Sequence, residues 1–352
     1  MRLVFSISFL WFILFSCASY EREGDSVPSK LSDNSREGRL RKTLAYLKEL
    51  SDEGDGEAGD YYKLAEISKE LGDAENGLKY ITRALQMKSS DPEYFFLKAE
   101  LLSKLKREDE ALQAAEEASA MELDTPKFYS FIAGLYLKKD SLSKAEEYLK
   151  ESLFIAPEWR ESLLLKASLL LKQQNPLAAQ QYLKNAFELN SPSSEGYYLL
   201  AKSYLEMEGR LDSAFAINRK GLEIDNNYPG LFYNQAKIME RLGRIDSAIA
   251  TYRKVTTLDI DEPAFADLGE LYIKYGNFTR AAESFEKQIE LTPDKKNFYF
   301  RAGFCLERLG QYKQAQELYL KGKTRFPDEV EIQTAYDRVS SVLERVYRSV
   351  EI

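Results

Sequence analysis

Large and small side chains recur along the chain with a period of about 34 residues between Ala58 and Glu329. In eight successive blocks the fourth place is large, and it holds Tyr61, Phe95, Tyr129, Leu163, Tyr197, Phe232, Phe265 and Tyr299. The eighth place is small, and it holds Ala65, Ala99, Ala133, Ala167, Ala201, Ala236, Gly269 and Gly303. The twentieth place is also small, with Gly77, Ala111, Ala145, Ala179, Ala214, Ala248, Ala281 and Ala315. Two helices approach closely only where a side chain is nearly absent, so the pattern predicts two packed helices, A and B, in every block.

Proline and glycine mark where these helices begin and end. Eight of the ten prolines lie at block junctions, namely Pro92, Pro126, Pro157, Pro192, Pro229, Pro263, Pro293 and Pro327. Pro176 is expected in a turn between helices and Pro28 precedes the blocks, so no proline falls where it would break a helix. Four blocks have a Leu-Gly or Tyr-Gly step between A and B, ending at Gly72, Gly243, Gly276 and Gly310.

The blocks resemble the tetratricopeptide repeat (TPR) family, with the fullest match in Phe265-x-x-Leu268-Gly269-x-x-Tyr272, followed by Ala281, Phe285 and Pro293. The resemblance implies an all-α fold, a right-handed α-solenoid of about eight helix-turn-helix repeats with terminal capping helices. The repeats would occupy residues 58–91, 92–125, 126–159, 160–193, 194–228, 229–261, 262–295 and 296–329.

Shorter amphipathic segments flank the repeats. Leucines 40, 44 and 47 predict an N-terminal helix within residues 39–57, placed to cover the first repeat. From Ile332 onward apolar residues follow the i, i+3, i+4, i+7 spacing of a helix buried on one side. Residues 330–352 are therefore expected to form a C-terminal capping helix, which a repeat stack needs at its open end.

The TPR resemblance also implies a ligand groove lined by places 2, 5, 9, 12 and 13 of helix A. Transferred to this chain, these places give as candidate partner-binding residues Tyr62, Phe96, Lys138, Lys172, Tyr198, Lys202, Tyr233, Lys237, Arg241, Lys274, Phe300 and Phe304. Cations and carboxylates occur there in equal numbers, which favours an amphipathic protein or peptide over a strongly charged ligand. The alternative is that the aromatic rings pack between repeats and do not contact a partner.

The amino-acid composition excludes most kinds of catalytic site. The 352 residues include no histidine, which excludes Ser–His and Cys–His nucleophilic systems and histidine-ligated metals. The two cysteines, Cys17 and Cys305, exclude a disulfide framework, and Cys305 is expected to be a core residue. A net charge of −8 disfavours a nucleic-acid partner. We therefore expect no catalytic residues, no metal and no cofactor.

The N-terminus has the features of an export signal. Residues 3–15 are apolar except for two serines, a length typical of a signal peptide and short of the roughly 20 residues of a membrane span. Leu14-Phe15-Ser16-Cys17 resembles the lipobox of bacterial lipoproteins, which implies a signal at 1–16, lipidation of Cys17 and a linker over 17–38. Ala18, where an Asp would favour the inner membrane, implies an outer-membrane anchor, with the periplasmic face favoured over the cell surface. An ordinary secretory signal and a retained anchor are the alternatives.

Together these features predict a non-enzymatic, lipid-anchored TPR scaffold that binds a protein or peptide partner at the bacterial envelope. The alternative is a nutrient-binding lipoprotein similar to SusD-type binders of glycans or peptides. Those proteins have long insertions and Trp-rich sites, whereas the blocks here are uninterrupted and Trp159 is the one tryptophan after Cys17.

Overall fold

The computed structural model describes residues 35–52, 56–189, 192–258 and 262–350. All regular structure in these residues is helical, in helices α2 to α19 with no strand. Successive helices form antiparallel pairs in chain order, as in an α-solenoid, which confirms the predicted fold class. The chain divides into two compact units, one up to Asp124 and the other from Thr125 onward.

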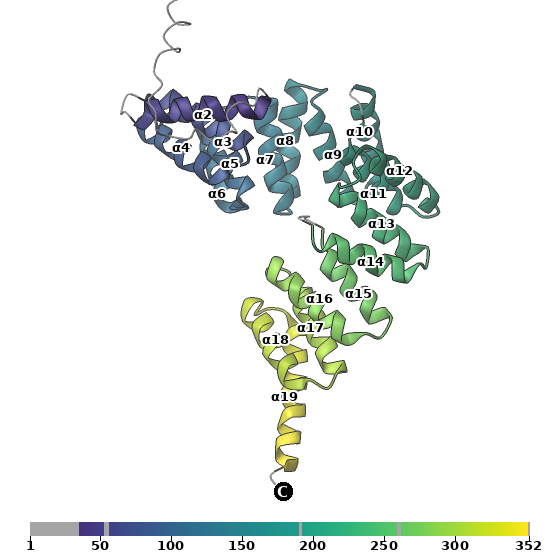
Figure 1. Ribbon diagram of the computed structural model, residues 1–352. Coiled ribbons are helices and arrows are strands. Elements are labelled where there is room, and N and C mark those ends of the chain that lie inside the picture. Colours follow the sequence, from purple (N-terminus) through teal and green to yellow (C-terminus); the bar gives the residue numbers. More distant parts are fainter. Residues whose placement is uncertain (1–34, 53–55, 190–191, 259–261, 351–352) are drawn as a thin grey trace, which may run out of the picture. The chain divides into compact units, whose positions relative to one another are not determined.

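Unit 1 contains the N-terminal helix and the first two repeats (Figure 1). Its helices are α2 (Arg36–Asp52), α3 (Ala58–Glu70), α4 (Ala74–Met87), α5 (Pro92–Lys104) and α6 (Glu108–Ala120). The N-terminal helix thus occupies residues 36–52, where the sequence indicated 39–57. It packs on α3, and Leu47 is its buried contact residue.

Unit 2 contains six repeats and the C-terminal helix. Helix A of these repeats is α7 (Pro126–Lys138), α9 (Arg160–Lys172), α11 (Ser194–Leu205), α13 (Pro229–Arg241), α15 (Ala264–Lys274) and α17 (Lys296–Arg308). Helix B is α8 (Leu142–Ile155), α10 (Pro176–Leu189), α12 (Leu211–Ile224), α14 (Ile245–Val255), α16 (Phe278–Leu291) and α18 (Tyr312–Arg325). The last helix, α19 (Val330–Val350), covers α18 by burying Ile332, Ala335 and Val339.

The small residues at the eighth and twentieth places form the contact between helices A and B. Every alanine at these places is fully buried, and the three glycines there are buried as well. A Cβ atom added to Gly269 would lie 2.8 Å from a ring carbon of Phe285, and one added to Gly303 would lie 2.3 Å from the ring of Tyr319. At these two places glycine faces an aromatic ring of helix B, whereas in the sixth repeat Ala236 is buried in helix A with Tyr252 at the same place of helix B.

The turn between helices A and B contains a left-handed residue in every repeat; it is the second residue after helix A in seven repeats and the fourth in the fifth repeat. A left-handed residue ends each helix A turn, with φ between 55° and 80°, at Gly72, Lys106, Asp140, Gln174, Gly209, Gly243, Gly276 and Gly310. Glycine adopts this conformation without strain, whereas other residues do so at a cost of about 1 kcal/mol. The Leu-Gly and Tyr-Gly steps thus identified four of these turns, and three turns keep the geometry without glycine.

Prolines mark helix starts as the sequence indicated, with one difference. Pro92, Pro126 and Pro229 occupy the first turns of α5, α7 and α13, where the missing N–H group costs no hydrogen bond. Thr125 caps α7 by accepting a hydrogen bond from the N–H of Phe128 at 3.2 Å. Pro176, expected in a turn, is the first residue of α10.

The ring contact at Gly269 gives a test of the packing rule. Gly269→Ala should lower the free energy of unfolding by about 1–2 kcal/mol, because overpacking against Phe285 exceeds the gain in helix propensity. In a Phe285→Leu background the same change should instead stabilise the protein by about 0.5–1 kcal/mol. The chain itself has Ala167 and Leu183 at the corresponding places of α9 and α10. Urea unfolding followed by circular dichroism measures both effects.

Gly134→Ala serves as the matched control for this cycle. Gly134 lies inside α7, and an added Cβ would meet its nearest neighbour, Leu165, at an ordinary 3.8 Å. This change should stabilise the protein by about 0.5–1 kcal/mol. If Gly269→Ala stabilises the parent chain to the same degree, the ring of Phe285 is not what requires glycine at position 269.

Candidate functional site

The candidate site lies on helices α11, α13 and α15 of unit 2, and it depends on an early end to helix α14. Helix α14 ends at Val255, and the hydroxyls of the next two residues, Thr256 and Thr257, turn back to the backbone of its last turn. Thr256 Oγ1 donates to the carbonyl of Arg253 at 2.9 Å, and Thr257 Oγ1 donates to that of Lys254 at 2.7 Å. The longer connection that results ends in Glu262, two residues before α15 begins.

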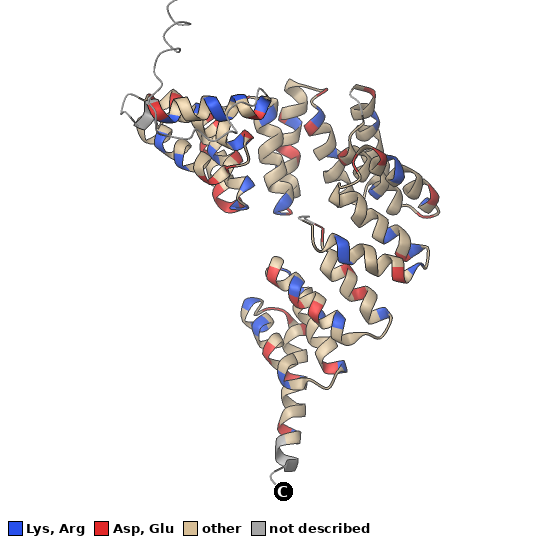
Figure 2. Cartoon of the chain, viewed as in Figure 1, with Lys and Arg blue, Asp and Glu red and all other residues tan. Residues whose placement is uncertain are grey.

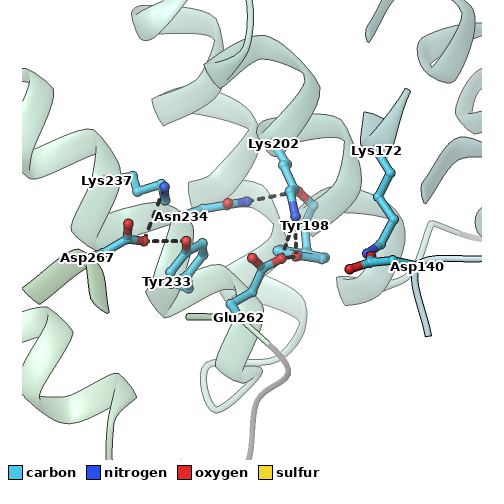
Figure 3. Close-up of polar contacts among 9 residues, drawn as sticks. All are labelled: Asp140, Lys172, Tyr198, Lys202, Tyr233, Asn234, Lys237, Glu262 and Asp267. Atoms are coloured by element: carbon cyan, nitrogen blue, oxygen red, sulfur yellow. Dashed lines mark hydrogen bonds and ion pairs between the residues drawn. The ribbon is translucent and has the colours of Figure 1, made fainter. Parts of the chain in front are cut away.

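Glu262 extends to a tyrosine and a lysine on α11 (Figure 3). The hydroxyl of Tyr198 donates to Glu262 Oε1, and Lys202 Nζ donates to the same oxygen at 2.5 Å. Lys202 Nζ also lies 3.3 Å from the Tyr198 hydroxyl oxygen. The side chains of Lys202 and Glu262 are 30% and 18% exposed, so the pair is partly shielded from water.

A second tyrosine and lysine repeat this arrangement on α13. The hydroxyl of Tyr233 donates to Asp267 Oδ2, and Lys237 Nζ lies 3.2 Å from the same oxygen. Figure 3 shows both residues pointing to Asp267, which projects from α15. In each pair the tyrosine is at place 5 and the lysine at place 9 of helix A, one turn apart on the same side. The lysine ammonium also lies near its tyrosine ring, 5.6 Å from the centroid on α11 and 5.0 Å on α13.

The two Tyr and Lys pairs are joined through the backbone. Asn234 on α13 is fully buried, and its Nδ2 donates to the carbonyl of Tyr198 at 2.8 Å. The ring of Tyr198 lies directly against Gly230, where an added Cβ would come within 2.7 Å of it. Consecutive helices A are therefore fixed at a spacing that brings both pairs to one surface.

The electrostatics of the site favour ionised carboxylates. Burial raises the pKa of the Glu262 carboxyl, but the charge of Lys202 and the hydrogen bonds from Lys202 and Tyr198 outweigh it, so the pKa lies below its ordinary value. Burial, followed by the charge of Asp267, raises the pKa of Tyr233, which therefore stays protonated and donates to that carboxylate.

The other predicted groove residues have varied surroundings. Lys172 pairs with Asp140 at 2.6 Å, and Arg241 donates to the carbonyl of Leu205 at the end of α11. Lys138 and Lys274 are exposed at the ends of α7 and α15.

Several predicted aromatic residues pack within their own unit. Phe96 and Tyr233 are each 3% exposed, so they offer a partner almost no surface, as expected if the rings pack between repeats. Tyr62 stacks on Tyr94 with ring centroids 5.0 Å apart. Phe300 and Phe304 are half-buried, against Tyr319 and Phe278 respectively.

The acidic partners Glu262, Asp267 and Asp140 were not among the predicted residues. They lie at places 1, 6 and 15 of their blocks, outside the places that line a TPR groove. The signal that could have found two of them is the Tyr-x-x-x-Lys spacing in consecutive blocks, since each such pair needs an acceptor.

Other chemistry is limited in the described part of the chain. There, no three His, Cys, Asp or Glu side chains are grouped so that they could hold a metal ion. Cys305 is fully buried, and burial raises the pKa of its thiol to about 12, so it stays protonated at neutral pH.

Among the described helices none is both long and apolar enough to cross a membrane. Cys17, the predicted signal at 1–16 and most of the predicted linker lie outside the described residues.

Family models match most of the repeat region. A tetratricopeptide-repeat model matches residues 62–121, 164–229 and 266–330, and a second one matches residues 229–259. No curated protein matches this chain at a significant level.

Solved structures show the same fold at low sequence identity. A TPR protein from Parabacteroides merdae is 18% identical with a TM-score of 0.56, over 71% of this chain and 98% of that one. The APC/C hetero-tetramer Cut9-Hcn1 includes a chain that is 14% identical with a TM-score of 0.58, over 87% of this chain. The present chain spans 60% of the length of that relative.

The ion pair at Glu262 predicts a pH-dependent loss of stability. Glu262→Gln should lower the free energy of unfolding by about 1 kcal/mol at pH 7, because Lys202 loses its counter-ion in a partly shielded position. The folded-state pKa of Glu262 lies below its unfolded value, so this contribution is complete above about pH 5. It is lost as pH falls through the folded pKa, and the difference between variant and parent should therefore shrink below about pH 4.

Urea unfolding at these pH values measures the difference. Glu223→Gln is the matched control, since it makes the same charge change on a side chain that is 66% exposed. It should change stability by less than about 0.5 kcal/mol. A Glu262→Gln effect that does not vary with pH would contradict the ionic contribution.

Proposed function

The chain belongs to the tetratricopeptide-repeat family, and from this premise we propose that it is a non-enzymatic scaffold that binds a protein or peptide partner on its helix-A face. We define the helix-A face as the side chains at places 2, 5, 9, 12 and 13 of helix A in unit 2. Tetratricopeptide repeats generally act as protein-interaction scaffolds and not as catalysts. The observation that supports this use here is the Tyr and Lys pair that recurs on α11 and α13, with the lysine 30% and 34% exposed.

Charge on the helix-A face is compatible with such binding. Basic and acidic residues are interspersed over the helices (Figure 2). At place 13 the exposed residues Lys138, Lys172, Arg241, Lys274 and Arg308 follow one another along unit 2, with Glu206 on α11 between them. Cations in the last turn of a helix also offset its dipole, so this row stabilises each helix A while remaining accessible to a partner.

We propose further that the scaffold is anchored by lipid at Cys17 in the outer membrane of a bacterium, facing the periplasm. The support is the sequence alone: a short apolar segment, the lipobox-like Leu14-Phe15-Ser16-Cys17, and Ala18 behind the cysteine. A tether of about 20 residues before α2 would let the repeats reach partners away from the membrane surface.

Binding on the helix-A face predicts a selective effect of charge reversal. Lys138→Glu/Lys274→Glu should reduce capture of envelope proteins by the full chain at least about fivefold, since both side chains are exposed on that face. Lys184→Glu/Lys220→Glu makes the same charge change on the helices B α10 and α12 and should leave capture unchanged. Quantitative mass spectrometry of the captured proteins provides the measurement. Equal losses in both variants, or in neither, would contradict the proposed face.

The lipid anchor predicts the location of the protein in cells. Cys17→Ala should move the full chain from the detergent phase to the aqueous phase on partitioning, because the thiol that accepts the lipid is gone. Cys305→Ala, which removes the other cysteine, should leave the protein in the detergent phase. A Cys17→Ala variant that stays in the detergent phase would show that something other than the lipid holds it.

A further inference from the structure

Tyr198 and Lys202 form a carboxylate site that the protein fills with its own Glu262. Both donors converge on one oxygen, Glu262 Oε1, and the lysine remains 30% exposed. We propose that this pair is the receiving site for a carboxylate of an acidic partner segment, and that Glu262 is an internal occupant which the partner displaces. The proposal rests on the scaffold function above and adds the chemistry of the partner.

The reach of Glu262 distinguishes it from the other ion pairs along the helices A. Lys69 and Glu100 join α3 to α5 at 2.6 Å, and Arg301 and Glu270 join α17 to α15 at 2.7 Å. Those pairs, like Lys237 and Asp267, link helices A of neighbouring repeats. Glu262 instead belongs to the seventh repeat and binds the fifth, and it stands on an inter-repeat connection, outside any helix. Asp140, which pairs with Lys172 and Lys295, also lies outside any helix, but its side chain is 52% exposed, whereas that of Glu262 is 18% exposed.

The chemistry of the pair selects an anion. A protonated tyrosine and an ammonium group offer two donors and a positive charge, which a carboxylate oxygen satisfies through charge-assisted hydrogen bonds. If Glu262 leaves, the partly shielded Lys202 loses its directly paired carboxylate and keeps only the charge of Glu206 nearby. A carboxylate from outside restores the same contacts and the same local charge, so the exchange leaves the electrostatics of the site unchanged.

The surroundings favour an acidic segment over an isolated carboxylate. The exposed cations at place 13 of α9, α13, α15 and α17 belong to the same row of helices, namely Lys172, Arg241, Lys274 and Arg308. Asp267 and Asp140, which lie outside the places that define this face, are paired with Lys237 and with Lys172 and Lys295 respectively. Asp140 neutralises Lys172, which leaves Arg241, Lys274 and Arg308 as the exposed cations of this row and Glu206 as its acidic member. The occupant that the pair already holds is a glutamate side chain, so an acidic protein segment is the partner whose chemistry matches the site.

Binding of a labelled octaglutamate peptide to the full chain, followed by fluorescence anisotropy, tests the proposal. Glu262→Gln should strengthen binding by about tenfold, because the internal competitor loses its charge. Glu262→Asp should also strengthen binding, since the shorter side chain reaches less far while net charge is unchanged. Adding Lys202→Ala to either variant should abolish the gain. An octaglutamine peptide should bind none of the variants more tightly than the parent.

Glu223→Gln separates occupancy from net charge, since it adds the same charge on an exposed side chain of α12. Octaglutamate binding that rises equally in Glu223→Gln and Glu262→Gln, or that does not rise in Glu262→Gln and Glu262→Asp, would overturn the proposal. Equal strengthening for an oligothymidylate probe would overturn the choice of an acidic protein segment. The capture experiment is independent of these results, because it uses no octaglutamate probe and compares the helix-A face with helices B.

Discussion

Close contact between helices A and B is the constraint on which the remaining structure depends. It requires a nearly absent side chain at two places in every repeat, and the structure buries all sixteen of these positions. Because the contact is local to each repeat, it fixes the pair geometry without long-range pairing. Opposite Phe285 and Tyr319 of helix B, the facing residue of helix A is glycine, and an added Cβ would lie against the ring. The sixth repeat instead buries both Ala236 and Tyr252 at these places.

The periodic part of the fold could be predicted from the sequence for this reason. Packing inside a repeat depends on side-chain size at fixed places, and size can be read directly from the residues. The starts of α3, α5, α7, α9, α11, α13 and α17 coincide with the starts of their blocks. The left-handed turn was predictable only where glycine occupies it, because Lys106, Asp140 and Gln174 adopt the same conformation without a sequence signal.

The site could be predicted only in part. Tyr198, Lys202, Tyr233 and Lys237 follow from the repeat register, and the structure brings them together on one surface. Their acceptors do not follow, since Glu262 lies on the connection between α14 and α15, outside the periodic helices. The degree of burial was also not predictable: Tyr198 and Tyr233 share a place in the repeat, yet only Tyr233 is fully enclosed, with its ring edge against Tyr252.

A regular repeat gives each helix A similar surroundings, so departures from the repeat are what make one part of such a surface differ from another. The departure here is the shortened α14, which frees enough chain for Glu262 to reach the fifth repeat. Other departures in this chain, such as the glycines opposite aromatic rings, are compensated within the same repeat by packing. The contact that Glu262 makes with α11 is different, because it is not needed to hold neighbouring repeats together. Asp267 already joins α13 to α15. Because the internal carboxylate is not needed for that joint, the site on α11 can exchange it without separating the repeats that Asp267 connects.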